Sequence, residues 1–243
     1  MQPPSATSMQ VHLLGLSDFL EVQALQRRMV YDLGERGGAS LILCEHPPTI
    51  SVGRSGSRSH IIPDDETLRA LGVRVHWVNR GGDCVLHLPG QLVAYLAYPL
   101  NHGGLTPVGY VDRLHEVILG VLREFDLEGV TRAGWPGIFL GRARVAAVGV
   151  AVSRWIAYHG FSINVGPSLD PFSLIEEPGP DSAPIRQTSM ESRRQRPAPM
   201  HRVREAVIRH VGRVLDLQEY HVHAGHPLIR RKVLSHAYAP SPG

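Results

Sequence analysis

The stretch from Gly137 to Val165 constrains the fold more than any other part of the chain. It contains three apolar segments, "GIFL", "RVAAVGVAVS" and "YHGFSINV", with only short connections between them. Short apolar runs bounded by turn residues are typical of β-strands. This stretch is therefore predicted to be three strands joined by tight connections, and the fold must include the sheet that they form.

Further strands and helices are predicted outside this stretch. Strand patterns occupy Val11–Leu14, Leu41–His46, Val73–Val78 and Gln91–Leu100. The segment "TISVG", after Pro47-Pro48, resumes a strand. Helical patterns run from a cap at Ser17 to about Leu33, over Asp64–Leu71, from Pro107 to about Asp126 and from about Met200 to Val214. Strands outnumber helices, and helices stand between groups of strands, so the predicted fold class is α+β, a mixed β-sheet flanked by α-helices.

The length of 243 residues suffices for one domain with a sizeable core. We expect residues 1–10 to be disordered, residues 11–217 to form a single domain, and residues 218–243 to form a polar C-terminal tail. No run of about 18 apolar residues is present, so no membrane span is predicted. The first residues lack a signal-peptide pattern, and the two cysteines form no CxxC pair, so a cytoplasmic location is expected.

The net charge of +3 is modest, and almost all of the basic side chains are arginine, because Lys232 is the only lysine. No block of Lys and Arg follows a helix face or alternates with aromatic residues, which argues against nucleic acid as a partner. A mild basic excess favours docking of acidic proteins.

The segment Arg80–Gln91, "RGGDCVLHLPGQ", concentrates residues with chemical potential. Adjacent glycines let a backbone approach a ligand closely and adopt positive φ angles. Arg80 suits a carboxylate or phosphate, and His87 suits a donor or a general base. The residues alone leave open a second interpretation, in which the segment is a polar hairpin between two strands.

Two other groups also have a structural interpretation beside a functional one. The small residues of "RVAAVGVAVS" either leave room for an apolar chain against the sheet or mark a crowded core. His159 is more typical of a structural histidine than of a catalyst. His221, His223 and His226 have HxH-like spacing, but no Asp, Glu or Cys lies at a suitable distance along the chain, so no metal site and no cofactor are predicted.

Five collinear segments, from about Val11 to Val214, resemble signatures of the bacterial lipoate-pathway octanoyltransferases. "EHPPTISVGR" is similar to that family's EHxPxxTxGR segment, and "RGGDCVLHLPGQ" is similar to its RGGxxTxHGPGQ signature. "RVAAVGVAVSRWIAYHGFSINV" resembles a stretch that begins KIAAIG and ends HGxAxN. "LDPFSLIEEPG" and "QTSM" resemble the segments LxxFxxIxPCG and TSL.

The resemblance implies the fold of the biotin and lipoate protein ligases. It also implies transfer of an octanoyl group from acyl carrier protein to a lysine of lipoyl domains, as in 2-oxoacid dehydrogenases or the glycine cleavage H protein. Both partners are typically acidic, which suits a mildly basic surface. The substrate-binding residues that the resemblance implies are Arg80, Gly81, Gly82, Asp83, Cys84, Val85, Leu86, His87, Ala147, Val148, Gly149, Gly160, Phe161 and Ser162.

The chain departs from the family where the chemistry takes place. In the family a cysteine attacks the thioester, and a nearby lysine lowers the pKa of that cysteine. Alignment places Arg144 at the lysine position and Pro178 at the cysteine position. Arginine keeps the positive charge but does not lose its proton, and proline offers no nucleophile. Val85 and Leu88 replace the threonine and the first glycine of the TxHGPGQ motif.

Cys84 is the candidate substitute for the missing nucleophile, because it lies in the same segment as His87. Side chains alternate along an extended strand, so Cys84 and His87 are expected to face opposite sides. Cys44 lies in a buried-strand pattern and is a weaker candidate.

Two functions stay open. In the first, the chain is an octanoyltransferase in which the acceptor lysine attacks the thioester directly and Arg144 polarises the carbonyl. In the second, it is a degenerate family member that binds acyl chains, acyl carrier protein or lipoyl domains without transfer. Ligase activity is a weaker interpretation, because the sequence has no GRGRRG-type adenylate loop and its single lysine lies near the C-terminus.

Overall fold

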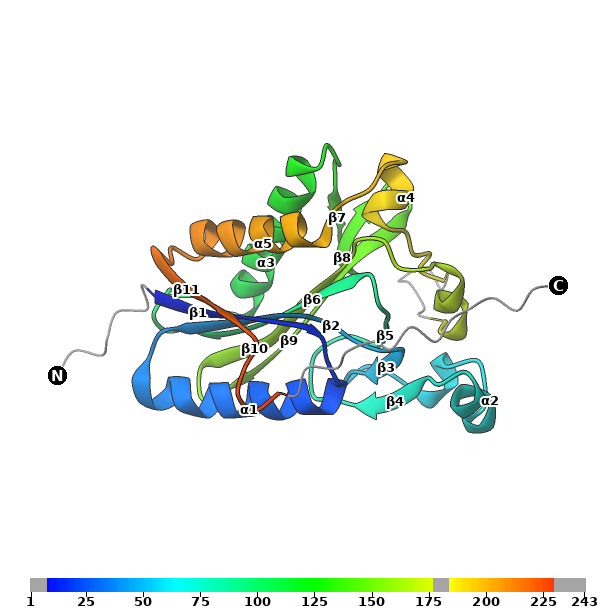
Figure 1. The fold of residues 1–243 in the computed structure, drawn as a ribbon, viewed down its shortest axis with the longest axis horizontal. Coiled ribbons are helices and arrows are strands. Elements are labelled where there is room, and N and C mark those ends of the chain that lie inside the picture. The colour runs from blue at the N-terminus through cyan, green and yellow to red at the C-terminus, as the bar shows by residue number, and fades with distance from the viewer. Residues whose placement is uncertain (1–7, 177–183, 230–243) are drawn as a thin grey trace.

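The computed structural model describes residues 8–176 and 184–229. An eight-stranded sheet forms the centre, with the strand order β11–β1–β2–β6–β10–β9–β8–β7 (Figure 1). Its strands are β1 (Ser8–Leu16), β2 (Ala39–Glu45), β6 (Gln91–Pro99), β7 (Val130–Arg132), β8 (Trp135–Leu140), β9 (Ala143–Ser153), β10 (Ile156–Asn164) and β11 (Glu219–Ala224). β1 pairs in parallel with β2 and β11, whereas the other neighbouring strands pair antiparallel. The predicted mixed sheet is therefore confirmed.

β9 and β10 form a tight hairpin in this sheet. Ser153 pairs with Ile156, and the two residues between them, Arg154 and Trp155, have φ angles of 51° and 63°. Two left-handed residues between paired strands make a turn whose twist matches that of the strands. Together with β8, the hairpin accounts for the three strands that the sequence predicts between Gly137 and Val165.

Helices cover both faces of the large sheet (Figure 1). On one face lies α1 (Phe19–Arg36), and on the other lie α3 (Pro107–Glu124) and α5 (Met200–Val214). Side chains of β2 alternate between the two cores: Leu41 belongs to the core beneath α3 and α5, and Ile42 to the core beneath α1. A strand buried on both faces has the continuous apolar pattern that marks β2 in the sequence.

The first helix starts one residue later than the sequence predicts. Its N-cap is Asp18, whose carboxylate accepts hydrogen bonds from the backbone N–H groups of Leu20 and Glu21. Ser17, the predicted cap, instead donates its hydroxyl to the carbonyl of Leu14. Aspartate and serine are equally good caps, so composition alone does not decide between adjacent candidates.

A second, three-stranded sheet lies at one end of the molecule (Figure 1). In it β3 (Thr49–Val52) pairs in parallel with β4 (Arg74–Trp77) and antiparallel with β5 (Cys84–His87). A separate apolar core covers one side of this sheet. The remaining short elements are η1 (Arg58–His60), α2 (Asp65–Ala70), η2 (Asp170–Leu174) and α4 (Met190–Arg194).

The two described ends of the chain form paired strands. β1 begins at Ser8, within the expected disordered segment, and Ser8–Leu13 pairs with Glu219–Ala224, within the expected tail. Every residue of β11 is exposed. In the sequence Tyr220, Val222 and Ala224 alternate with polar residues, a strand pattern that the expectation of a polar tail left out. Residues 1–7 and 230–243 lie outside the described part.

Within the described residues, no helix is both long and apolar enough to cross a membrane.

Candidate functional site

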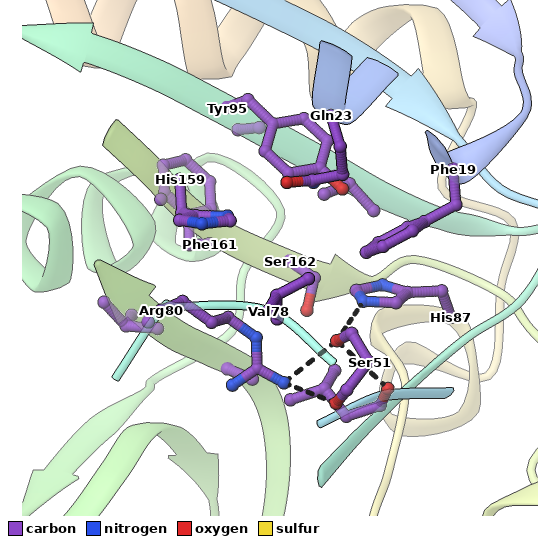
Figure 2. Close-up of a pocket in the computed structure, with 17 residues that line it drawn as sticks. Phe19, Gln23, Ser51, Val78, Arg80, His87, Tyr95, His159, Phe161 and Ser162 are labelled. Atoms are coloured by element: carbon purple, nitrogen blue, oxygen red, sulfur yellow. Dashed lines mark hydrogen bonds between the residues drawn. The ribbon is translucent and has the colours of Figure 1, made fainter. Parts of the chain in front are cut away.

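A pocket lies between the two sheets and the first turns of α1 (Figure 2). Strands β6, β9 and β10 of the large sheet form one wall, and β3, β5 and the Val78–Arg80 segment form the other. Its lining residues are Phe19, Gln23, Ser51, Val78, Arg80, Val85, His87, Val93, Ala94, Tyr95, Ala147, Val148, Gly149, His159, Gly160, Phe161 and Ser162. Most of these are apolar or small, and the polar ones converge from different elements.

The glycine loop crosses β9 at very short range. The N–H of Gly81 donates to the carbonyl of Val150 over 2.8 Å. A Cβ atom at Gly149 would lie 2.8 Å from the carbonyl oxygen of Gly81, closer than real Cβ contacts allow. The absence of a side chain at position 149 therefore lets the backbones of the two sheets come close together. This close backbone approach, rather than a crowded core, explains the glycine.

Arg80 ties the loop to the small sheet. Its Nη2 donates to the carbonyl of Ser51 (2.7 Å), to Ser51 Oγ (2.9 Å) and to the carbonyl of Asp83 (2.8 Å). Its Nη1 donates to the carbonyl of Gly81 (3.0 Å). The side chain is buried, so a positive charge is fixed at the pocket wall by the hydrogen bonds of the guanidinium to backbone carbonyl oxygens.

His87 is buried at the opposite side of Ser51 (Figure 2). Its Nε2 lies 2.9 Å from Ser51 Oγ, and its Nδ1 lies 2.9 Å from Gln91 Oε1. Burial, with further contributions from His46 and Arg80, holds the pKa of His87 well below its ordinary value of 6.5. The ring is therefore neutral at pH 7, the form that accepts a proton.

Two further histidines are fixed beside the pocket. His46 contacts the carbonyl of Ser17 through Nδ1 (2.8 Å) and the hydroxyl of Tyr95 through Nε2 (2.9 Å), and burial lowers its pKa to about 4. His159 lines the pocket, and its Nε2 lies 3.0 Å from Asn79 Oδ1. Burial, followed by the charge of Arg80, lowers the pKa of His159 to about 3. Both rings act as neutral packing and hydrogen-bonding groups.

The structure brings most of the sequence-predicted binding residues to this pocket. Those that line it are Arg80, Val85, His87, Ala147, Val148, Gly149, Gly160, Phe161 and Ser162. Gly81 and Gly82 belong to the loop that closes it, while Asp83, Cys84 and Leu86 do not line it. The alternation along β5 explains this division, since Val85 and His87 face the pocket and their neighbours face the second core.

Cys84, the candidate substitute nucleophile, therefore lies behind the pocket wall. Its side chain is fully buried in the second core with Ile50 and Leu86. Its Sγ donates to the carbonyl of Ser57 over 3.7 Å. The opposite orientation of Cys84 and His87 agrees with the expected alternation, and this position does not support nucleophilic attack on a ligand in the pocket.

Arg144 lies at the start of β9, outside the set of described residues that line the pocket. It is buried, and its backbone N–H donates to the carbonyl of Arg186, while its carbonyl accepts from the N–H of Thr188. These bonds fix residues 186–188 against the sheet. Pro178 falls in 177–183, outside the described residues.

Among the described residues, one group has side chains close enough to share a metal ion: His60, Asp83 and Cys84. The Asp83 carboxylate already accepts from His60 Nδ1 (2.8 Å) and from the N–H of Cys84 (2.6 Å). The HxH-like triplet forms a different arrangement: the rings of His223 and His226 pack on His12 with centroids 5.0 Å away. None of the residues in these two groups lines the pocket.

Sequence reasoning missed Phe19, Ser51 and Tyr95 as lining residues. Ser51 carried a signal, because it stands at the threonine of the EHxPxxTxGR motif. Phe19 and Tyr95 carried none, since an apolar helix start and an aromatic residue in a buried strand have the pattern of ordinary core positions.

Comparisons with known proteins agree with this geometry. Residues 18–212 match the model of the lipoyl protein ligase A/B catalytic domain. An octanoyltransferase from Syntrophobacter fumaroxidans is 37% identical over 170 residues, covering 68% of this chain and 73% of the relative. One from Desulforamulus reducens is 32% identical over 208 residues, covering 84% and 90%.

A solved structure of a putative lipoate protein ligase from T. acidophilum, with bound lipoic acid, superposes with a TM-score of 0.73. It covers 91% of this chain and 90% of its own at 14% identity, which supports the fold alone. The family match and the two relatives reach further: this chain belongs to the lipoyl protein ligase A/B catalytic domain family.

Proposed function

We propose that this chain is an octanoyltransferase of lipoate biosynthesis, which moves an octanoyl group from acyl carrier protein to a lysine of a lipoyl domain. The observation that carries the proposal is the pocket between β3, β5, β9 and β10, in a chain whose relatives are named octanoyltransferases. Those names favour transfer over the alternative of binding without transfer.

The pocket suits an acyl chain. Its walls include Val78, Val93, Val148 and Phe161, which offer apolar surface that a hydrocarbon chain would remove from water. Ala147 and Gly149 leave room along β9 where larger side chains would fill the space. Arg80, Ser51 and His87 lie together at one side, where the thioester carbonyl would be held (Figure 2).

A groove next to the pocket suits an acidic carrier. It shares Gln23 and Val78 with the pocket, and it is lined by Arg27, Arg54 and Arg154. Its described lining includes no acidic residue. Clustered positive charge favours encounter with an acidic protein, and a groove that joins the pocket gives the carrier's thioester arm a route to it.

Arg144 remains the candidate at the family's lysine position. Its backbone bonds to residues 186–188 place it beside the segment that follows the family's cysteine position. We assign it a positioning role with a fixed positive charge, since an arginine does not exchange protons with substrate at neutral pH.

The test is transfer by the purified full-length chain from octanoyl-acyl carrier protein to an apo-lipoyl domain, followed by intact mass of the domain. We expect one octanoyl group per domain, and none on a domain whose acceptor lysine is replaced by arginine. Complex formation without product above the enzyme-free background, at high enzyme concentration, would instead support binding without transfer.

A pocket-filling variant links this activity to the site. Ala147→Phe places a large ring in the pocket and is expected to abolish transfer. Val152→Phe is the matched control, because Val152 lies on the same strand but is exposed and outside the pocket. Equal loss in both variants would detach the activity from this pocket.

A further inference from the structure

A chain of hydrogen bonds between buried side chains ends at the hydroxyl of Ser51 on the pocket wall, and Figure 2 draws its last bond, from His87 to Ser51. Ser51 Oγ lies 2.9 Å from His87 Nε2, and His87 Nδ1 lies 2.9 Å from Gln91 Oε1. Gln91 Nε2 donates to Asn164 Oδ1 over 2.8 Å, and Asn164 Nδ2 donates to the carbonyl of Thr188 over 3.0 Å. The chain thus runs from Ser51 on β3 through β5, β6 and β10.

Backbone carbonyls fix the direction of every proton in this chain. A carbonyl oxygen only accepts, so the contact to Thr188 orients the amide of Asn164, and a contact of Gln91 Nε2 to the carbonyl of Leu86 (3.1 Å) orients that of Gln91. Gln91 Oε1 therefore accepts, and His87 Nδ1 carries the proton. In the neutral ring Nε2 has a free lone pair, and Ser51 donates its hydroxyl to it.

Other contacts of Ser51 agree with this direction. Its hydroxyl also lies 3.5 Å from the carbonyl of Val85, a longer and weaker alternative to the 2.9 Å contact with His87. Arg80 Nη2 donates to the same Oγ over 2.9 Å. A hydroxyl that donates to a neutral imidazole and accepts from a guanidinium has both a proton acceptor and a stabilising charge for its oxygen anion.

The arrangement is that of a serine, a base and a third group that orients the base. Gln91 takes the orienting place, and because it is neutral, it fixes the tautomer of His87 without stabilising an imidazolium. The charge of Arg80 makes protonation of His87 harder still. Acylation through this group is therefore expected to be slow compared with a serine–histidine–aspartate enzyme, while its geometry is complete.

The two cysteines do not compete with this hydroxyl. Cys84 packs in the second core, behind the pocket wall. Cys44 is fully buried in the core beneath α1, and burial raises the pKa of its thiol far above the ordinary value.

We propose that Ser51 is the nucleophile that replaces the family's cysteine and carries the octanoyl group as an oxygen ester between carrier and acceptor. The inference rests on the proposed octanoyltransferase function. Ser51 occupies the threonine position of the EHxPxxTxGR motif, so a hydroxyl at this position is part of the family pattern. The new element of the proposal is that this hydroxyl holds the octanoyl group.

The proposed reaction has two acyl-transfer steps. Ser51 Oγ attacks the thioester carbonyl while its proton passes to His87 Nε2; the carbon–sulfur bond breaks, and the proton leaves with the carrier thiol. The lysine amine of the lipoyl domain then attacks the ester carbonyl, the carbon–oxygen bond breaks, and the amine's proton returns to Ser51 through His87. No oxidant, metal or nucleotide is needed.

The experiment incubates the full-length chain with octanoyl-acyl carrier protein in the absence of acceptor, followed by intact mass and peptide mapping. We expect one octanoyl group on the Ser51 peptide. An oxygen ester resists neutral hydroxylamine, whereas a thioester on Cys84 or Cys44 is cleaved. Ser51→Ala is expected to abolish the adduct, and Ser55→Ala, an exposed serine close by, to leave it unchanged.

Two further variants keep the test decisive if Ser51→Ala misfolds. Ser51→Cys should keep the adduct at the same position and make it labile to hydroxylamine. His87→Gln should slow acylation at saturating octanoyl-acyl carrier protein by about a hundredfold, the lower range for a lost general base. An adduct on either cysteine would overturn the proposal.

The outcomes separate this inference from the proposed function. Acylation of Ser51 without octanoylated lipoyl domain would support the nucleophile and reject the transferase. Normal transfer by folded Ser51→Ala would reject Ser51 as the nucleophile and leave the transferase function supported. The same conclusion would follow if the wild-type chain transfers octanoate but forms no acyl-serine and does not exchange octanoate between carrier molecules. Absence of both adduct and transfer would reject both.

Discussion

The two sides of the site differ in how far they keep the family's pattern. On the side of β3 and β5, Ser51, Arg80 and His87 form a buried, fully hydrogen-bonded group. At the start of β9, Arg144 occupies the position that alignment gives to the family's lysine, and in the sequence Pro178 aligns with the family's cysteine. The difference teaches that a pocket and its polar frame persist where the expected reactive pair does not, so the chemistry must be sought in the frame.

Removal of Arg80 should have the largest effect, because it breaks the frame itself. Arg80→Leu removes the donor to the buried carbonyl and hydroxyl of Ser51 and leaves the carbonyl of Asp83 with the N–H of Gly53 (3.2 Å), and buried acceptors without partners cost about 1–3 kcal/mol each. We expect a loss of about 3 kcal/mol or more in the free energy of unfolding, measured with urea. Arg80→Lys should recover only part, because an ammonium does not reproduce the fork. Wild-type stability in Arg80→Leu would show that the tie is unnecessary.

Restoring the family's reactive pair tests the other side. Arg144→Lys with Pro178→Cys should raise octanoyl transfer by about a hundredfold, the lower range of general acid–base and nucleophilic contributions. The measurement is single-turnover transfer to the apo-lipoyl domain. Combined with Ser51→Ala, the pair should restore activity through the new cysteine. An unchanged rate would mean that the frame no longer presents a thioester to this side.

The buried histidines should make the pocket side sensitive to acid. Burial lowers the folded-state pKa values of His46 and His159 to about 4 and about 3, whereas the unfolded chain has ordinary values near 6.5. Below pH 6.5 the unfolded state therefore binds protons that the folded state does not. Stability is complete above that pH and falls as the pH drops, by up to about 1.4 kcal/mol per unit for each ring.

Urea unfolding at several pH values between 7.5 and 5 measures this slope. His159→Asn should reduce it by about one proton's share, and asparagine tolerates the positive φ of 62° at that position. His102→Gln, at an exposed residue outside the pocket lining, is the control for the substitution itself. A slope that His159→Asn does not alter would contradict the burial of a neutral ring.

A charge reversal in the groove should have the smallest effect. Arg27→Glu is expected to raise the KM for octanoyl-acyl carrier protein about fivefold at low salt, with little change in kcat, because rim charges mainly steer encounter. The effect should shrink as salt is added. Arg28→Glu on the same helix is the matched control, since Arg28 pairs with Asp32 and does not line the groove. Equal effects in both would place the carrier elsewhere.

Much of the fold could be predicted because its central strands are buried on both faces. The continuous apolar runs of "RVAAVGVAVS" and of β2 both report burial. β11 has the alternation of a strand, but its apolar residues Tyr220 and Val222 are exposed, so the pattern does not report burial in a core. β5 was hidden inside a segment interpreted as a loop, since four residues are too few for a periodicity to show.

The candidate site was predicted in outline and missed in its most reactive detail. Glycines and His87 marked the pocket through the family resemblance, and alternation correctly placed Cys84 and His87 on opposite faces. The hydrogen bond between Ser51 and His87 depends on the pairing of β3 with β5, because the two residues are 36 positions apart in the sequence. Such a pairing is a tertiary event with no local signal.

One rapid-quench time course tests the central claim, that the kept frame transfers octanoate without the family's reactive pair. The reaction mixture contains wild-type chain, octanoyl-acyl carrier protein and apo-lipoyl domain. Mass spectrometry measures the masses of the Ser51 peptide and of the lipoyl domain at each time point. We expect the lipoyl domain to be octanoylated faster than in the absence of enzyme, and the amount of acyl-Ser51 to rise first and then decline. No octanoylated domain above that rate, at enzyme in excess over the domain, would contradict it.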